Sequence, residues 1–118
     1  MRIKICGITR PEDARFAEHA GADAIGVIVC SPDSKRSVSL ERAAEIFSAV
    51  GPFTTTVAVT HTCSEGELRQ ILAAGPDAIQ VFHPFIFDRD TGVKVIRAIG
   101  RADPLPAGSA DGGRKRDA

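Results

Sequence analysis

Runs of isoleucine and valine alternate with amphipathic stretches along the first hundred residues of the chain. Five apolar runs have the length and composition of strands: 3–6, 24–29, 55–60, 78–82 and 93–100. They contain little polar alternation, which is typical of parallel strands that are covered on both faces. Helix-like segments separate them, so the order of elements predicts βα units in an α/β fold.

Hydroxyl side chains mark where the intervening helices should begin. Thr9 opens a T-x-x-E capping box, and Pro11 suits the first turn of the helix that follows. Ser39 precedes a second amphipathic run, and Ser64 opens another capping box. Gly21 is placed to end the first helix. These signals predict three helices between the first four strands.

One internal repeat supports this order of elements. The segment AGADAIGV (20–27) matches AGPDAIQV (74–81) at six of eight positions, at an offset of 54 residues. That offset corresponds to two βα units, and a (β/α)8 barrel built by duplication shows such a repeat. Convergence on a good sequence for ending a helix and starting a strand explains the match equally well, so both interpretations stay open.

Composition and charge narrow the class of protein. Hydrophobic residues make up 43% and charged residues 25%, as in ordinary globular proteins. Lys+Arg and Asp+Glu number 15 each, which gives no reason to expect nucleic acid or an anionic membrane as a partner. The apolar runs are too short to span a bilayer, and the N-terminus lacks a signal-peptide core. Three widely spaced cysteines fit reduced thiols, so we expect a cytoplasmic location.

Cys6 ends the first predicted strand, and Gly7 follows it. In a parallel βα array, catalytic groups collect at the carboxyl ends of the strands. A thiol acts as a base or nucleophile when cations or helix N-termini stabilise its thiolate, and Lys4 lies on the same side of this strand. Cysteine is also a common small core residue, so position alone leaves catalysis and packing open.

A more specific signal lies in the first 39 residues. The segments KICGIT (4–9), RPEDA (10–14), GADAIG (21–26) and SKRSVS (34–39) have the order and spacing found in phosphoribosylanthranilate isomerases. A looser likeness continues to about residue 101. The chain therefore resembles the N-terminal part of this family from tryptophan biosynthesis. The resemblance implies a TIM barrel and a cofactor-free aldose–ketose isomerase, with a small phosphorylated molecule as its substrate.

The resemblance also implies roles for three residues. Cys6 would be the general base of an Amadori rearrangement that converts N-(5-phosphoribosyl)anthranilate to 1-(2-carboxyphenylamino)-1-deoxyribulose 5-phosphate. Arg36 would hold the anthranilate carboxylate, a task that suits a planar guanidinium. His83 would line the substrate site, although two residues separate it from Gln80 where the family has one.

The likeness ends before a barrel is complete. In the family, the general acid is an aspartate after the sixth strand, and the phosphate site follows strands 7 and 8. Neither has a counterpart here, so we expect one incomplete barrel of about five parallel strands over 1–101. Residues 102–118, rich in Gly, Pro and charge, predict a disordered polar tail. We therefore expect a truncated or frameshifted product that is inactive alone, or a half-barrel completed by a chain carrying the C-terminal half.

Two other functions stay open. Another sugar-phosphate barrel enzyme, such as an epimerase, would share the fold, although KICGIT argues against it. A non-catalytic βα module would bind a partner through its open edges. A metal site is not expected, because His61, Cys63 and His83 lie on two different loops without a ligand-pair motif.

Overall fold

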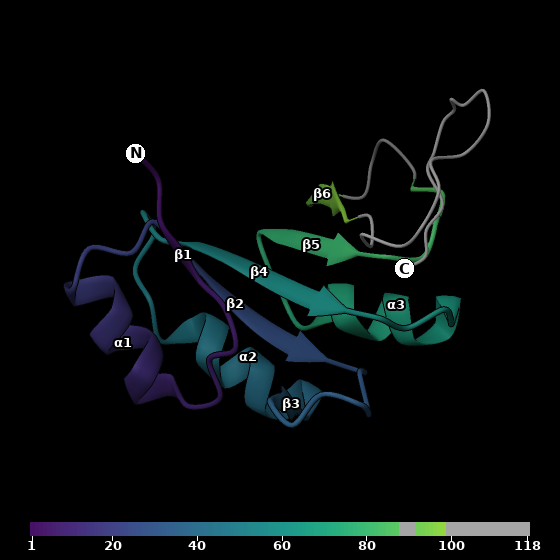
Figure 1. Ribbon diagram of the computed structural model, residues 1–118, viewed down its shortest axis with the longest axis horizontal. Helices are drawn as coiled ribbons and strands as arrows, with labels where there is room; N and C mark the ends of the chain where they lie inside the picture. The colour runs from purple at the N-terminus through teal and green to yellow at the C-terminus, as the bar shows by residue number, and fades with distance from the viewer. Residues whose placement is uncertain (88–91, 99–118) are drawn as a thin grey trace.

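A single parallel sheet with helices on one face makes up the fold (Figure 1). The computed structural model describes residues 1–87 and 92–98. Its strands are β1 (Lys4–Ile5), β2 (Ala24–Val29), β3 (Ser37–Val38), β4 (Thr55–Thr60), β5 (Ala78–Val81) and β6 (Lys94–Arg97). They lie in the order β1-β2-β4-β5-β6, and the short β3 pairs with β2 beside this path.

The two faces of the sheet differ in what covers them. Helices α1 (Pro11–His19), α2 (Leu40–Ser48) and α3 (Glu65–Ala73) pack on one face and bury the main core. Since successive strand residues point to opposite faces, the alternate residues form a second, smaller cluster on the inner face. That cluster centres on Val57, Val59 and Ala78. Within the described residues, no helix has the length and apolar content needed to cross a bilayer.

The inner face is concave. The Lys4 Nζ atom of β1 donates a hydrogen bond of 2.7 Å to Gln80 Oε1 of β5. Strands β2 and β4 lie between them. In a flat sheet, three strand spacings of about 4.8 Å would separate the two backbones by roughly 14 Å. The two side chains reach each other because the sheet curves, as the wall of a barrel does.

The predicted parallel α/β architecture is confirmed, with differences in detail. The strands predicted over 24–29 and 55–60 have the predicted bounds. The first is shorter, because only Lys4–Ile5 pairs with β2. The last two end earlier than predicted, at Val81 and Arg97. Strand β3 is an addition, since two residues are too few to give a periodic pattern. The predicted tail, 102–118, lies outside the described residues.

The serine caps are confirmed. The Ser39 side chain accepts a hydrogen bond from the Arg42 backbone N–H, and the Ser64 side chain accepts one from that of Glu67. The second half of the predicted capping box at Ser64 does not form. The Glu67 carboxylate instead accepts a short hydrogen bond from the Thr62 hydroxyl, and this hydroxyl accepts from the Ser64 N–H.

The predicted cap at Thr9 is wrong. Helix α1 begins at Pro11, with Arg10 as its N-cap and no side-chain capping bond. A residue before proline is forced toward extended backbone, and Arg10 has φ −139° and ψ 145°. The cap position therefore falls on Arg10, one residue later than predicted. The Arg10 guanidinium pairs with the Asp13 carboxylate at 3.0 Å.

Candidate active site at the carboxyl edge of the sheet

Cys6 lies directly after β1, on the concave side of the sheet. Its side chain is exposed, and its Sγ lies close to Gly26 of β2. A Cβ added at Gly26 would come within 3.1 Å of the Cys6 Sγ, so the glycine makes room for the thiol. The backbone is fixed beside it, because the Gly7 N–H donates to the Gly26 carbonyl at 3.0 Å. The thiol therefore has a defined place at the carboxyl edge.

Arg36 reaches the same point from a distant part of the chain. It stands just before β3, and its Nη1 donates to the Gly7 carbonyl oxygen at 3.5 Å. A Cβ on Gly7 would lie 2.9 Å from the Arg36 Cδ, and the φ of Gly7 is +83°, a conformation that favours glycine. Among the described residues, no carboxylate forms a salt bridge with Arg36. The guanidinium is thus available to an anionic ligand beside Cys6.

His83 has a different setting. Its ring contacts Phe85 edge-on, with the ring centroids 4.7 Å apart. Phe85 belongs to the core on the helix side of the sheet, whereas Phe82 packs against the inner cluster. The described contacts of His83 therefore connect it to Phe85, and they do not join it to Cys6 or Arg36.

His61 stands at the carboxyl end of β4 and contacts the inner side of the sheet. Its ring stacks on Phe82 with centroids 4.1 Å apart and planes at 11°. Its Nδ1 lies 3.2 Å from the Ser31 Oγ, and its backbone N–H donates to the same oxygen at 2.9 Å. Sequence reasoning considered His61 only as a metal ligand. Its place directly after a predicted strand was the signal for this edge position.

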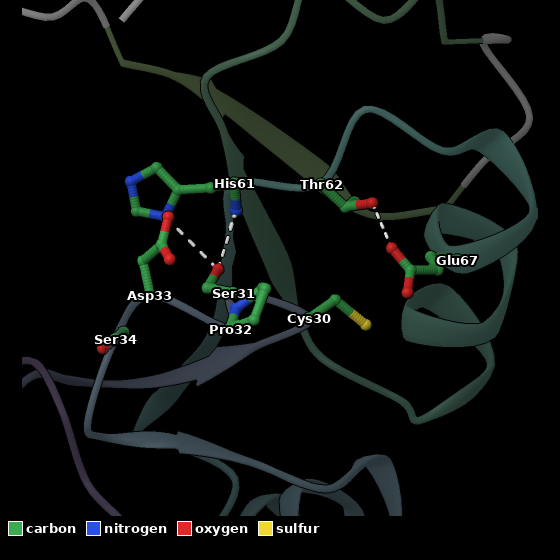
Figure 2. A pocket seen from close by; sticks show the side chains of 8 residues that line it. All are labelled: Cys30, Ser31, Pro32, Asp33, Ser34, His61, Thr62 and Glu67. Atoms are coloured by element: carbon green, nitrogen blue, oxygen red, sulfur yellow. Dashed lines mark hydrogen bonds between the residues drawn. The ribbon is translucent and has the colours of Figure 1, made fainter.

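A pocket of about 640 Å³ opens between the loops that follow β2 and β4 (Figure 2). The residues that line it are Cys30, Ser31, Pro32, Asp33, Ser34, His61, Thr62 and Glu67. Burial raises the pKa of the Cys30 thiol, and the nearby Glu67 carboxylate raises it further. Cys30 is therefore held as a neutral thiol, which is a poor base or nucleophile near neutral pH.

The histidines and cysteines do not assemble into a metal centre in the part of the chain that the structure describes. Residues 1–87 and 92–98 contain no group of three or more His, Cys, Asp or Glu side chains that could hold a metal ion. His61 is engaged with Ser31 and Phe82, and His83 with Phe85.

Two curated proteins that are similar in sequence to this chain share one name. No family model matches the chain. An N-(5'-phosphoribosyl)anthranilate isomerase from Methanoregula boonei is 64% identical over 106 residues, which cover 90% of this chain and 54% of that protein. The enzyme of the same name from Stutzerimonas stutzeri is 51% identical over 83 residues, covering 70% of this chain and 40% of its own length. The chain thus spans about half the length of the curated relatives it matches.

Solved structures give the same result. The phosphoribosyl anthranilate isomerase of Thermus thermophilus superimposes with a TM-score of 0.74 at 35% identity, covering 94% of this chain and 57% of its own. A second such isomerase, crystallised with reduced 1-(o-carboxyphenylamino)-1-deoxyribulose 5-phosphate, has a TM-score of 0.74 at 32% identity, covering 87% of this chain and 55% of its own.

These likenesses and the open, curved parallel sheet agree with one another. In sequence and in fold, the chain is homologous to the N-terminal portion of the N-(5'-phosphoribosyl)anthranilate isomerases, which are TIM-barrel enzymes.

Proposed function

We propose that this chain supplies the base and the carboxylate-binding group of a phosphoribosylanthranilate isomerase. The observation that carries the proposal is the meeting of Cys6 and Arg36 at Gly7, at the carboxyl edge of a barrel-like sheet. The substrate is N-(5-phosphoribosyl)anthranilate, and the product is 1-(2-carboxyphenylamino)-1-deoxyribulose 5-phosphate. The site therefore acts in tryptophan biosynthesis, and we expect it in the cytoplasm.

The reaction is an internal redistribution of hydrogen. A general acid protonates the ring oxygen of the ribose, the C1–O bond breaks, and a Schiff base forms at C1. The Cys6 thiolate then takes the proton from C2, and the electron pair of that C–H bond moves to give an enolamine. Reprotonation at C1 and loss of the hydroxyl proton give the C2 ketone. The product is an isomer of the substrate, and C2 is oxidised as C1 is reduced, so atoms and electrons balance without an external oxidant or reductant.

Arg36 and His83 would orient the substrate. The fork of the Arg36 guanidinium matches the two oxygens of the anthranilate carboxylate, which would hold the amino-sugar beside Cys6. For His83 we retain a substrate contact as a proposal. The edge-on contact of the His83 ring with Phe85 supports this role, because it keeps the ring near the carboxyl end of β5.

The proposed reaction needs groups beyond those described. In the isomerase family that the sequence resembles, the general acid follows the sixth strand of the barrel, and the phosphate site follows the seventh and eighth strands. Element β6 of this chain is only the fifth strand along the sheet, so these groups would come later than β6. We therefore propose that the described residues supply one part of the catalytic machinery and that turnover requires the rest of a barrel. The open sheet also favours a second candidate function, a non-catalytic module that binds a partner chain.

Turnover with a matched pair of cysteine variants tests the proposed function. The chain would be joined covalently to the portion of the Methanoregula boonei relative that it does not match. We expect the fusion to convert phosphoribosylanthranilate, and Cys6→Ala to lower kcat by about 10²- to 10⁴-fold, the usual contribution of a general base. Cys63→Ala, at another exposed thiol, should leave turnover unchanged. Equal turnover with and without the Cys6 thiol would refute the role of Cys6.

Substrate choice distinguishes the rival enzyme class. A fusion that ignores phosphoribosylanthranilate and converts a pentose phosphate would indicate a sugar-phosphate epimerase or isomerase. A fusion without activity on either substrate, in a folded protein, would favour the non-catalytic module.

A further inference from the structure

The loop that carries Arg36 leaves β2 and returns to it. It begins at Cys30, whose φ of 51° lies in the left-handed region that residues other than glycine rarely adopt. It ends where β3 pairs in parallel with the last two residues of β2, and Arg36 stands directly before β3. Strained backbone of this kind persists only where the surrounding contacts hold it. The contacts of the next residue, Ser31, therefore bear on where Arg36 lies.

The Ser31 side chain joins this loop to the end of β4. Ser31 is 3% exposed, and its Oγ accepts a hydrogen bond of 2.9 Å from the His61 backbone N–H. The same hydroxyl donates its one proton to the Val29 carbonyl at 3.1 Å. The His61 Nδ1, 3.2 Å away, must then carry a proton and donate as well (Figure 2). One buried hydroxyl is thus bonded to residues at the ends of β2 and β4.

Hydrogen bonds within the loop connect Ser31 to Arg36. The Ser34 N–H donates to the Ser31 carbonyl at 2.9 Å, and the Arg36 N–H donates to the Ser34 Oγ at 3.3 Å. The Ser31 N–H donates to the Ser37 Oγ at 3.3 Å, which closes the loop against β3. An unbroken series of hydrogen bonds therefore runs from His61 through Ser31 and Ser34 to the backbone of Arg36.

We infer that Ser31 is a positioning residue for Arg36. Its hydroxyl, held by His61, fixes the loop so that the Arg36 guanidinium stays at the Gly7 carbonyl, beside Cys6. Ser31 thus acts through Arg36, not through a contact of its own with the substrate. The inference deepens the proposed function and rests on it, because it concerns the group that would bind the anthranilate carboxylate.

Binding of an analogue of the product to the covalent fusion tests this inference. Reduced 1-(o-carboxyphenylamino)-1-deoxyribulose 5-phosphate would be titrated by calorimetry. We expect Ser31→Ala to weaken its binding about tenfold, because the ligand must then order a loop that is released from His61. Ser48→Ala removes an exposed hydroxyl that donates to the Ala44 carbonyl in α2, and it should leave the affinity unchanged. Unchanged affinity in a folded Ser31→Ala fusion would overturn the inference.

A double-mutant cycle with Arg36 separates positioning from a general loss of structure. In an Arg36→Ala fusion, Ser31→Ala should weaken binding no further, because the group that it positions is gone. With Arg36 present, Ser31→Ala should raise KM about tenfold and leave kcat within about threefold, since Cys6 keeps its place. An equal loss of affinity in both backgrounds, or a loss of kcat with unchanged KM, would overturn the inference.

A second variant keeps the test decisive if Ser31→Ala fails to fold. Ser34→Ala removes the acceptor of the Arg36 N–H and leaves the buried Ser31 hydroxyl in place. We expect it to weaken binding of the analogue about two- to fivefold, the effect of one hydrogen bond, and only while Arg36 is present. A loss that persists in the Arg36→Ala fusion would contradict a series of bonds that acts through Arg36.

The turnover of the Cys6→Ala and Cys63→Ala fusions separates this inference from the proposed function. If the fusion converts phosphoribosylanthranilate through Cys6 and Ser31→Ala leaves KM unchanged, the positioning role is refuted and the isomerase proposal stays intact. If the fusion binds the analogue with Ser31 coupled to Arg36 but does not turn over, the positioning role is supported and the isomerase proposal is refuted.

Discussion

At the scale of single residues, two glycines shape the candidate site. Gly26 leaves room for the Cys6 thiol, and Gly7 lets the Arg36 side chain lie against the backbone that follows Cys6. Cys6 and Arg36 could be predicted as site residues from the sequence, because both lie in segments that resemble the isomerase family. The close packing of Cys6 against Gly26 and of Arg36 against Gly7 could not be predicted, since these contacts join segments about 20 to 30 residues apart in the sequence. The stack of His61 on Phe82 was missed for the same reason.

Gly26→Ala should damage the site and the fold together. The new methyl group would stand 3.1 Å from the Cys6 Sγ and 3.4 Å from its Cα, so the backbone or the thiol must move. Overpacking of this kind costs about 1–3 kcal/mol in the free energy of unfolding. Urea denaturation would measure the loss.

Gly66→Ala is the matched control for that substitution. The added methyl group would meet only the Ser64 Oγ, at 3.6 Å, in the first turn of α3. Alanine is favoured over glycine in helices by up to about 1 kcal/mol, so this variant should be as stable as the parent or more so. Equal destabilisation by both substitutions would contradict the close packing of Cys6 on Gly26.

At the scale of elements, the same local device is used twice. The segments 20–27 and 74–81 have matching sequences, and Gly21 and Gly75 both have positive φ, at +105° and +91°. The Asp23 carboxylate accepts from the backbone N–H of Ile3, directly before β1, and the Asp77 carboxylate accepts from that of Thr56 in β4. The repeat was visible in the sequence. The contacts of the two aspartates could not be predicted from the sequence, because they join segments that are distant along the chain.

The helix caps should differ in strength according to their observed bonds. Replacing Ser39 or Ser64 by alanine removes a side-chain acceptor from a helix N-terminus and should lower the free energy of unfolding by about 1 kcal/mol each. Thr9→Ala should change it little, since Thr9 lies outside the cap of α1. Thermal unfolding of the three variants measures this difference. A loss at Thr9 as large as at Ser39 would contradict the assigned start of α1.

Glu18 connects α1 to the turn before β4 and should make stability depend on pH. Its carboxylate accepts from the Thr54 hydroxyl at 2.6 Å and from the Gly51 N–H at 2.8 Å. These two hydrogen bonds lower the pKa of the Glu18 carboxyl below its usual 4.5, and the bond from Thr54 has the larger effect. A lowered pKa in the folded state stabilises the fold above the unfolded pKa, and this contribution disappears as the pH falls through the folded value.

Urea denaturation at several pH values tests the role of Glu18. At pH 7 the parent chain should be more stable than Glu18→Gln. The difference should shrink as the pH falls below about 4.5, where the parent carboxylate gains its proton. A difference that stays constant between pH 7 and pH 3 would show that the bonds to Thr54 and Gly51 do not depend on the charge of Glu18.

At the scale of the whole molecule, the pattern of apolar runs predicted a parallel sheet, and the Lys4–Gln80 bond reveals its curvature. The curvature could not be predicted from the pattern, because strand periodicity reports burial and not the angle between strands. Among residues 1–87 and 92–98, β1 pairs only with β2 and β6 only with β5, as at the two ends of five strands on a barrel path. We propose that Cys6 and Arg36 lie in one substrate site at the carboxyl edge of this sheet.

Protection of Cys6 by a bound ligand tests whether the two residues share this site. The covalent fusion would be alkylated with iodoacetamide in the presence and absence of reduced 1-(o-carboxyphenylamino)-1-deoxyribulose 5-phosphate, an analogue of the product. Mass spectrometry would measure the alkylation rates of Cys6 and Cys63 separately. We predict that saturating analogue slows alkylation of Cys6 at least tenfold, because the ligand bound at Arg36 covers the thiol, and leaves exposed Cys63 unchanged. Bound analogue with an unchanged rate at Cys6 would contradict the claim.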